Sequence, residues 1–322
     1  MPHKDMGNWR SQISGEKIDY TPVRSVEELV TRRDTGTSIF TRLNVDMPDV
    51  AATHEKVVMR PNGRSTPTAE IYVPHGDGPF PVLLHLHGGG WFTGSAEGER
   101  KLAMQFAAAG FVVVNLDYAL APENPFPTGL EDCVYAARWI VRNIADYNGD
   151  PTRLAVGGGS AGGNLSACTV LALHGSDEGL DGADLAGVLV KFSGAVLQFA
   201  VLDVPRWLHE PHYYAGTSEI YVMSYLGMNF TDRIRNPLIS PVYSPHLSKM
   251  PPVYLSCGDE DAFLSHTLTM ANALTLVDVP TTVSIVEGAD HEFLKIPNIV
   301  AEAGPERERI VNWLHRHLKR TS

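Results

Sequence analysis

The stretch GGSAG at residues 158–162 decides the fold of this chain, because an apolar run precedes it and a run of small residues follows it. Residues 153–157 are typical of a buried strand, and residues 161–173 are compatible with a helix. A serine between them lies on a sharp turn that only very small neighbours tolerate. The pattern predicts a strand, a tight turn and a helix with Ser160 as nucleophile, although a glycine-rich loop around a phosphate has a similar pattern.

A second glycine-rich loop follows an earlier apolar run. Residues 81–86 are typical of a buried strand, and the sequence HGGGW at 87–91 comes directly after it. Consecutive glycines leave backbone N–H groups exposed, and such groups can stabilise the oxyanion of a tetrahedral intermediate. A plain turn seldom needs three glycines between a histidine and a tryptophan, so we interpret this loop as a candidate oxyanion hole.

Two later loops carry an acidic cluster and a histidine. The run 252–257 precedes the sequence GDED, which ends at Asp261, and the run 281–286 precedes a loop that contains His291. The order serine, acid, histidine is that of the α/β-hydrolase triad. Each member follows a predicted strand, at the edge where open α/β sheets place their active sites. The sequence therefore predicts a Ser-Asp-His triad.

In combination, these motifs resemble the hormone-sensitive lipase family of esterases. The likeness covers roughly residues 80 to 315 and is specific because several motifs occur in one order. It implies an α/β-hydrolase fold, in which a mostly parallel twisted sheet has helices on both faces and a helical cap. It also implies carboxylester hydrolysis without a metal or organic cofactor. The motifs are HGGGW, DYALAPE at 117–123, GSAGGN at 159–164, G-x-x-D at 258–261 and H-x-F at 291–293.

The resemblance assigns roles to individual residues. It implies that Ser160, Asp261 and His291 form the catalytic triad. The N–H groups of Gly88, Gly89 and Ala161 are then the implied oxyanion hole.

Three positions depart from the family pattern. Gly159 replaces the acidic residue usual before the nucleophile, Ala119 replaces the arginine usual after Asp-Tyr, and Ala262 replaces the proline usual after the triad acid. None of these positions carries a reacting atom. We expect the first two to change the polarity of the pocket and the choice of substrate rather than the reaction.

The expected mechanism begins when His291 takes the proton from the serine as general base, while the acid holds the other ring nitrogen. Asp259 and Glu260 share a loop with Asp261, and Asp290 precedes the histidine, so these three carboxylates compete for the role of the acid. The G-x-x-D match favours Asp261.

The composition excludes several classes of protein. The chain has 322 residues, 43% hydrophobic and 20% charged, which is typical of a globular protein with one large core. A formal net charge of −11 argues against a nucleic-acid partner, and no apolar stretch is long enough to span a membrane. The N-terminus lacks an apolar signal region, so we expect a cytoplasmic protein. Its cysteines, Cys133, Cys168 and Cys257, are expected to be buried free thiols.

Two segments are expected to cover the catalytic domain. Residues 1–50 form an N-terminal cap segment, and the domain at 51–322 carries a helical lid at about 193–250. An antiparallel hairpin is expected at 56–60 and 69–73. The predicted parallel strands are 81–86, 111–116, 153–157, 186–191, 252–257 and 281–286.

The lid sequence is rich in aromatic residues and methionine, which favours an apolar acyl pocket of limited depth. The expected substrate is a small ester with a short acyl chain, and the sequence leaves a homodimer open. An amidase or lactonase with the same triad is an alternative, and so is a ligand-binding protein that lost catalysis on this fold. The apolar and aromatic residues of this expected lid are Phe199, Trp207, Leu208, Tyr213, Tyr214, Tyr221, Met223, Tyr225, Leu226 and Met228.

Overall fold

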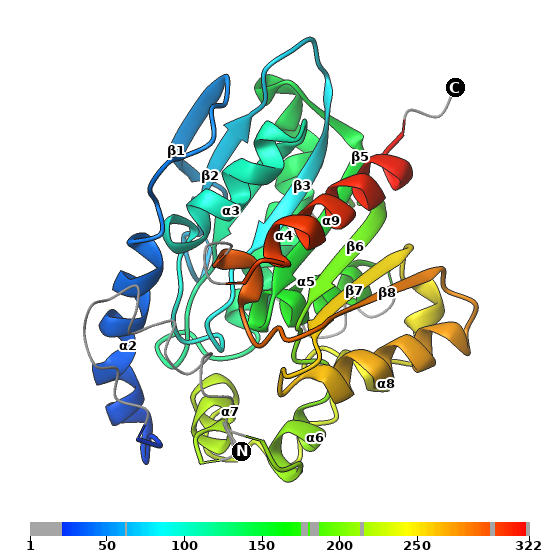
Figure 1. Cartoon of the computed structure of the whole chain (residues 1–322). Helices are drawn as coiled ribbons and strands as arrows, with labels where there is room; N and C mark the ends of the chain where they lie inside the picture. The colour runs from blue at the N-terminus through cyan, green and yellow to red at the C-terminus, as the bar shows by residue number, and fades with distance from the viewer. Residues whose placement is uncertain are drawn as a thin grey trace.

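The computed structural model describes residues 21–61, 63–174, 180, 187–212, 216–296 and 300–319. In this part of the chain the strands form one eight-stranded sheet with the order β1-β2-β4-β3-β5-β6-β7-β8 (Figure 1). The two first strands are antiparallel to their neighbours, and the sheet from β4 to β8 is parallel. The strands are β1 Ala52–Val58, β2 Thr68–Val73, β3 Phe80–Leu86, β4 Val112–Asp117, β5 Gly149–Gly159, β6 Phe192–Gln198, β7 Val253–Gly258 and β8 Thr281–Val286.

Helices cover both faces of the sheet. Helices α3 and α9 lie on one face, and α4, α5 and α8 lie on the other (Figure 1). This arrangement confirms the predicted α/β-hydrolase fold. The helices are α2 Val26–Thr41, α3 Ala96–Ala108, α4 Thr128–Asn143, α5 Ala161–His174, α6 Val204–His209, α7 Ser218–Leu226, α8 Leu264–Thr275 and α9 Ala303–His317, and the 3-10 helices are η2 Ile144–Tyr147, η3 Pro241–Tyr243, η4 Leu247–Lys249 and η5 Phe293–Lys295.

The apolar runs of the central strands are continuous because both of their faces are buried. In β3, Val82, Leu84 and Leu86 pack into the core beneath α4, α5 and α8, whereas Leu83 packs into the core beneath α3 and α9. Successive side chains of a strand point to opposite faces, so one run of apolar residues serves both cores. The sheet thereby holds the carboxyl ends of its parallel strands in fixed positions.

Most of the predicted elements are confirmed, but the strand predicted at 186–191 is wrong. Residues 187–191 are not a strand, residue 186 lies outside the described residues, and the strand is β6 Phe192–Gln198. Leu189 is 85% exposed, whereas Val196 and Leu197 are buried between β5 and β7. Two apolar runs are adjacent in the sequence here, and only the second forms a strand of the sheet. The first residues of the lid expected from 193 onward therefore belong to β6.

In its described part, the segment after β6 contains the short helices α6 and α7 and the 3-10 helices η3 and η4, joined by turns and irregular stretches. Helix α7 packs against α2, where Leu29 and Phe92 form a cluster with Ile220 and Tyr221. These helices lie together at one end of the sheet (Figure 1). Tyr213 and Tyr214 lie outside the described residues, as do residues 1–20 of the expected N-terminal cap segment.

Candidate active site

The turn between β5 and α5 has the tight geometry that its glycines require. Ser160 has a φ of 56°, in the left-handed region that residues with a Cβ rarely adopt. A Cβ at Gly158 or Gly162 would lie 2.1 or 2.0 Å from the carbonyl oxygen of Leu86, so neither position accepts a side chain. The Ser160 N–H donates to the Gln198 carbonyl at 2.9 Å. The end of β5 is therefore fixed between β3 and β6, with the serine at the apex of the turn.

The three predicted triad residues meet in one hydrogen-bonded chain. His291 Nε2 lies 2.9 Å from Ser160 Oγ, and His291 Nδ1 lies 2.9 Å from Asp261 Oδ2. Ser160, Asp261 and His291 are 6%, 5% and 8% exposed, so this hydrogen-bonded triad is almost completely shielded from water. The residues come from the loops after β5, β7 and β8, which the parallel sheet brings to the same edge.

The carboxylate of Asp261 is held on both sides. Its Oδ1 accepts the backbone N–H of Phe263 at 2.8 Å, which leaves Oδ2 directed at the histidine. Asp259 accepts a backbone N–H from the loop after β8, and Asp290 accepts the N–H of the next residue. Asp259 and Glu260 are exposed. Among the four competing carboxylates, Asp261 therefore has the contacts of a triad acid.

The charges around His291 raise its pKa. Burial of the ring lowers the pKa, but the negative charge and hydrogen bond of Asp261 outweigh this effect, with further help from Glu292 and Asp290. The same negative charges stabilise the imidazolium that forms when the ring accepts a proton. The site is thus suited to general-base chemistry.

Aromatic rings connect His291 with the helical segment after β6. The ring centroids of Phe199 and Phe263 lie 5.1 and 5.2 Å from that of His291. Trp207 follows at 5.4 Å from Phe263, and Tyr221 at 5.9 Å from Trp207. No sequence motif indicates Phe263, whose only signal is its place two residues after Asp261. Together these rings form a continuous aromatic wall that begins at the triad histidine.

The glycine loop after β3 differs in one respect from the sequence prediction. The N–H of Gly88 donates to Glu99 Oε1 at 3.3 Å. Within the residues that the structure describes, the N–H groups of Gly89, Gly90 and Ala161 have no hydrogen-bond acceptor. The geometry therefore disfavours Gly88 as an oxyanion donor and leaves Gly89 and Ala161, with Gly90 as an additional candidate.

One of the departures from the family pattern has a structural explanation. A Cβ at Gly159 would lie 2.5 Å from Cε2 of Phe199, so the aromatic ring occupies the space of the missing side chain. At Ala119 the backbone N–H donates to Asp132 Oδ2 at 2.9 Å, a contact that an arginine there could make equally. Burial raises the pKa of Asp132 to about 6, against the effect of its hydrogen bonds. The side of the turn next to the nucleophile is therefore aromatic rather than charged.

The described residues form neither a metal site nor a membrane-spanning helix. Over these ranges no group of three or more histidine, cysteine or acidic residues is placed to hold a metal ion. Nor does any helix there combine the length and hydropathy needed to cross a bilayer. The predicted burial of Cys133, Cys168 and Cys257 as free thiols is confirmed.

Comparisons with known proteins agree with this fold. Residues 83–295 match the model of a family described as alpha/beta hydrolase fold. Carboxylesterase NlhH of Mycobacterium tuberculosis is 30% identical over 241 residues, which cover 74% of each chain. Ethyl acetate hydrolase of Pseudomonas putida is 29% identical over 268 residues, which cover 80% of each chain.

A solved structure titled bacterial heroin esterase is similar over almost the whole chain. It is 26% identical, covers 93% of this chain and 95% of its own, and has a TM-score of 0.79. The motifs, the sheet order and these similarities all point to one group of proteins. The chain belongs to the α/β-hydrolase family and, within it, to the hormone-sensitive lipase family of esterases.

Proposed function

We propose that this protein is a serine carboxylesterase that hydrolyses short-chain acyl esters through an acyl-enzyme. The observation that carries the proposal is the hydrogen-bonded chain from Ser160 through His291 to Asp261. A buried serine within 2.9 Å of an imidazole, which a carboxylate orients in turn, is the arrangement of an activated nucleophile.

In the first half of the reaction, His291 Nε2 takes the proton from Ser160 as Oγ attacks the ester carbonyl. Asp261 keeps the remaining proton on Nδ1 and stabilises the imidazolium. The ring then gives its proton to the leaving alcohol, and the acyl group stays on the serine. In the second half, water attacks the acyl-enzyme with the same ring as general base.

The negative charge of the tetrahedral intermediate needs donors that are free in the resting protein. The N–H groups of Gly89, Gly90 and Ala161 meet this condition, whereas that of Gly88 is engaged by Glu99. Gly89 has a φ of 117°, and a Cβ there would lie 2.1 Å from the Thr93 carbonyl oxygen, so the loop needs glycine at this position. We assign the oxyanion hole to these three N–H groups.

The aromatic wall favours the proposal that the substrate has a short acyl chain. Trp207 and Tyr221 belong to α6 and α7, which with α2 form the proposed cap, and a Cβ at Gly90 would lie 3.3 Å from the Tyr221 ring. Each buried methylene contributes about 0.8 kcal/mol until the pocket is full, so a shallow pocket favours short chains. The relative from Pseudomonas putida is named ethyl acetate hydrolase, which agrees with such a substrate.

The test is a series of acyl esters from acetate to palmitate, together with an arylamide and a lactone, on the wild type and Ser160→Ala. We expect the highest kcat/KM at acyl chains of about two to six carbons, and loss of turnover in Ser160→Ala. Faster turnover of the amide or lactone would support the alternative enzyme classes. A maximum at long chains, with a jump above the solubility limit, would indicate a lipase instead.

A further inference from the structure

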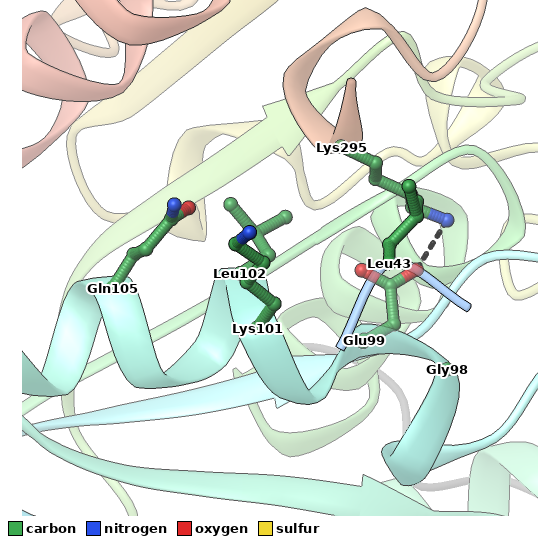
Figure 2. A pocket seen from close by; sticks show the side chains of 7 residues that line it. All are labelled: Leu43, Gly98, Glu99, Lys101, Leu102, Gln105 and Lys295. Carbon is green, nitrogen blue, oxygen red and sulfur yellow. Dashed lines mark ion pairs between the residues drawn. The ribbon is translucent and has the colours of Figure 1, made fainter. Parts of the chain in front are cut away.

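A buried ion pair lies beside the glycine loop, outside the triad. Lys295 in η5 directs its Nζ at Oε1 of Glu99 in α3, and the two side chains are 7% and 5% exposed. Figure 2 shows Lys295 reaching down to Glu99 in a small pocket that Leu43 and Leu102 also line. Taking two charges out of water is costly, so a pair of this kind needs close and well-oriented partners.

Glu99 has further partners on both carboxylate oxygens. Its Oε1 accepts the Gly88 N–H at 3.3 Å, in addition to the lysine. Its Oε2 lies 3.4 Å from Nε2 of His85, which is the second-last residue of β3. Burial would raise the pKa of Glu99, but the charge of Lys295 and the contact with His85 lower it well below its usual range. An ionised Glu99 therefore joins α3 to the start of the glycine loop.

Lys295 joins the same pair to the histidine loop. Its Nζ lies 3.2 Å from Oε1 of Glu292, the residue after His291, and 4.3 Å from the ring centroid of Phe40 in α2. Burial would lower the pKa of Lys295, but the charges of Glu292 and Glu99 raise it instead. The lysine therefore remains charged between two carboxylates and under an aromatic ring.

Glu292 occupies a backbone position that favours glycine. Its φ is 65°, in the left-handed region, where a side chain with a Cβ is unfavourable. The carboxylate of this residue reaches Lys295, so the unfavourable backbone is combined with a buried ion pair. This combination indicates that the position of the histidine loop depends on Lys295.

We propose that Glu99 and Lys295 are positioning residues that fix the glycine loop relative to the catalytic histidine. Glu99 holds the Gly88 N–H, which turns this group away from the substrate and sets the direction of the N–H groups that follow. Lys295 connects Glu99 with Glu292 and so joins the glycine loop to the residue after His291. This inference rests on the proposed function, because it concerns the same site.

Disruption of the Glu99–Lys295 pair should affect turnover more than substrate binding. The oxyanion forms only in the transition state, so a misdirected loop lowers kcat and leaves KM almost unchanged. Removing one oxyanion donor typically lowers kcat by about a hundredfold or more, and a donor that is only displaced should cost less. We therefore expect a loss of about tenfold in kcat when the pair is disrupted.

The experiment uses two variants and one matched control. Glu99→Gln keeps the shape of the side chain but removes its charge, and leaves Lys295 paired with Glu292. The triple variant Glu99→Leu/Glu292→Gln/Lys295→Met removes all three charges, so that no buried carboxylate of this group is left without its partner. The control is Glu306→Gln in α9, which removes another fully buried carboxylate, one that contacts Ser256 and Tyr254 of β7.

Each protein is assayed for kcat and KM on a short acyl ester, for the rate of inactivation by a serine-directed phosphonate, and for Tm. We expect both Glu99 variants to lose about tenfold in kcat and in inactivation rate, with KM within about threefold of the wild type. The control should keep the wild-type kcat even if its Tm falls.

A kcat within about twofold of the wild type in both Glu99 variants would overturn the inference. An equal loss of kcat in Glu306→Gln would also overturn it, because stability alone would then explain the effect. If the wild type itself neither hydrolyses esters nor reacts with the phosphonate, the proposed function fails instead.

Discussion

Introducing a methyl group at Gly159 should disturb both the stability and the activity of the protein. In Gly159→Ala the new Cβ would lie 2.5 Å from Cε2 and 2.9 Å from Cζ of Phe199. Ordinary contacts between carbon atoms are about 3.5–4.0 Å, so the ring must move by roughly 1 Å. The ring is 1% exposed and packs against the rings of His291 and Phe293, which leaves it little free space.

The size of the effect follows from overpacking and from the contact with the histidine. Overpacking a buried site typically costs about 1–3 kcal/mol, which for a chain of this size lowers Tm by about 1.5–4.5 °C. The displaced Phe199 ring presses on His291, and a shift of about 1 Å in a catalytic group can lower the rate by a hundredfold. We therefore expect Gly159→Ala to lower kcat by about tenfold to a hundredfold.

Thermal unfolding and ester turnover check this prediction in a double-mutant cycle with Phe199→Leu. The smaller side chain should give the methyl group space, so the double variant Gly159→Ala/Phe199→Leu should be more stable than the sum of the single effects predicts. The coupling should be about 1 kcal/mol or more. An unchanged Tm and kcat in Gly159→Ala, or strictly additive effects in the cycle, would refute the proposed contact.

Two further predictions concern the acid and the base. Since His291 must be neutral to act as a base and its pKa is raised, kcat/KM should rise with pH through an apparent pKa above the reference of about 6.5, and a profile that is flat from about pH 5 to 9 would contradict this. Asp261→Asn should lower kcat by about four orders of magnitude and shift that limb to lower pH, because burial then dominates the pKa of the histidine. Asp259→Asn and Asp290→Asn should retain most of the activity in the same assay, and an inactive Asp259→Asn would reassign the acid.

Much of this architecture could be predicted from the sequence, because its main signals are local. The runs that form β3, β5 and β7 are largely buried, whereas β8 is mostly exposed, and each of the four is followed by a loop with distinctive residues. Chain order then placed Ser160, Asp261 and His291 at one edge of a parallel sheet. The strand β6 was misplaced because a neighbouring apolar run, which includes the exposed Leu189, has the same local pattern.

The contacts that depend on packing between distant segments could not be predicted. Gly88 and Glu99 are 11 residues apart, and only the docking of α3 brings the carboxylate to the glycine N–H. Lys295 reaches Glu99 from the far end of the chain, and no motif joins them. Phe199 fills the space beside Gly159 because the end of β6 lies next to that of β5. Such contacts determine how the loops of the site are held, whereas the motifs determine only their chemistry.

The most direct test of the central claim is to label the intact protein with a serine-directed phosphonate and locate the adduct by mass spectrometry. We predict one adduct per chain, on the peptide that contains Ser160, with ester turnover lost in proportion to labelling and no adduct in Ser160→Ala. An adduct on another residue, or turnover that survives complete labelling, would contradict the account.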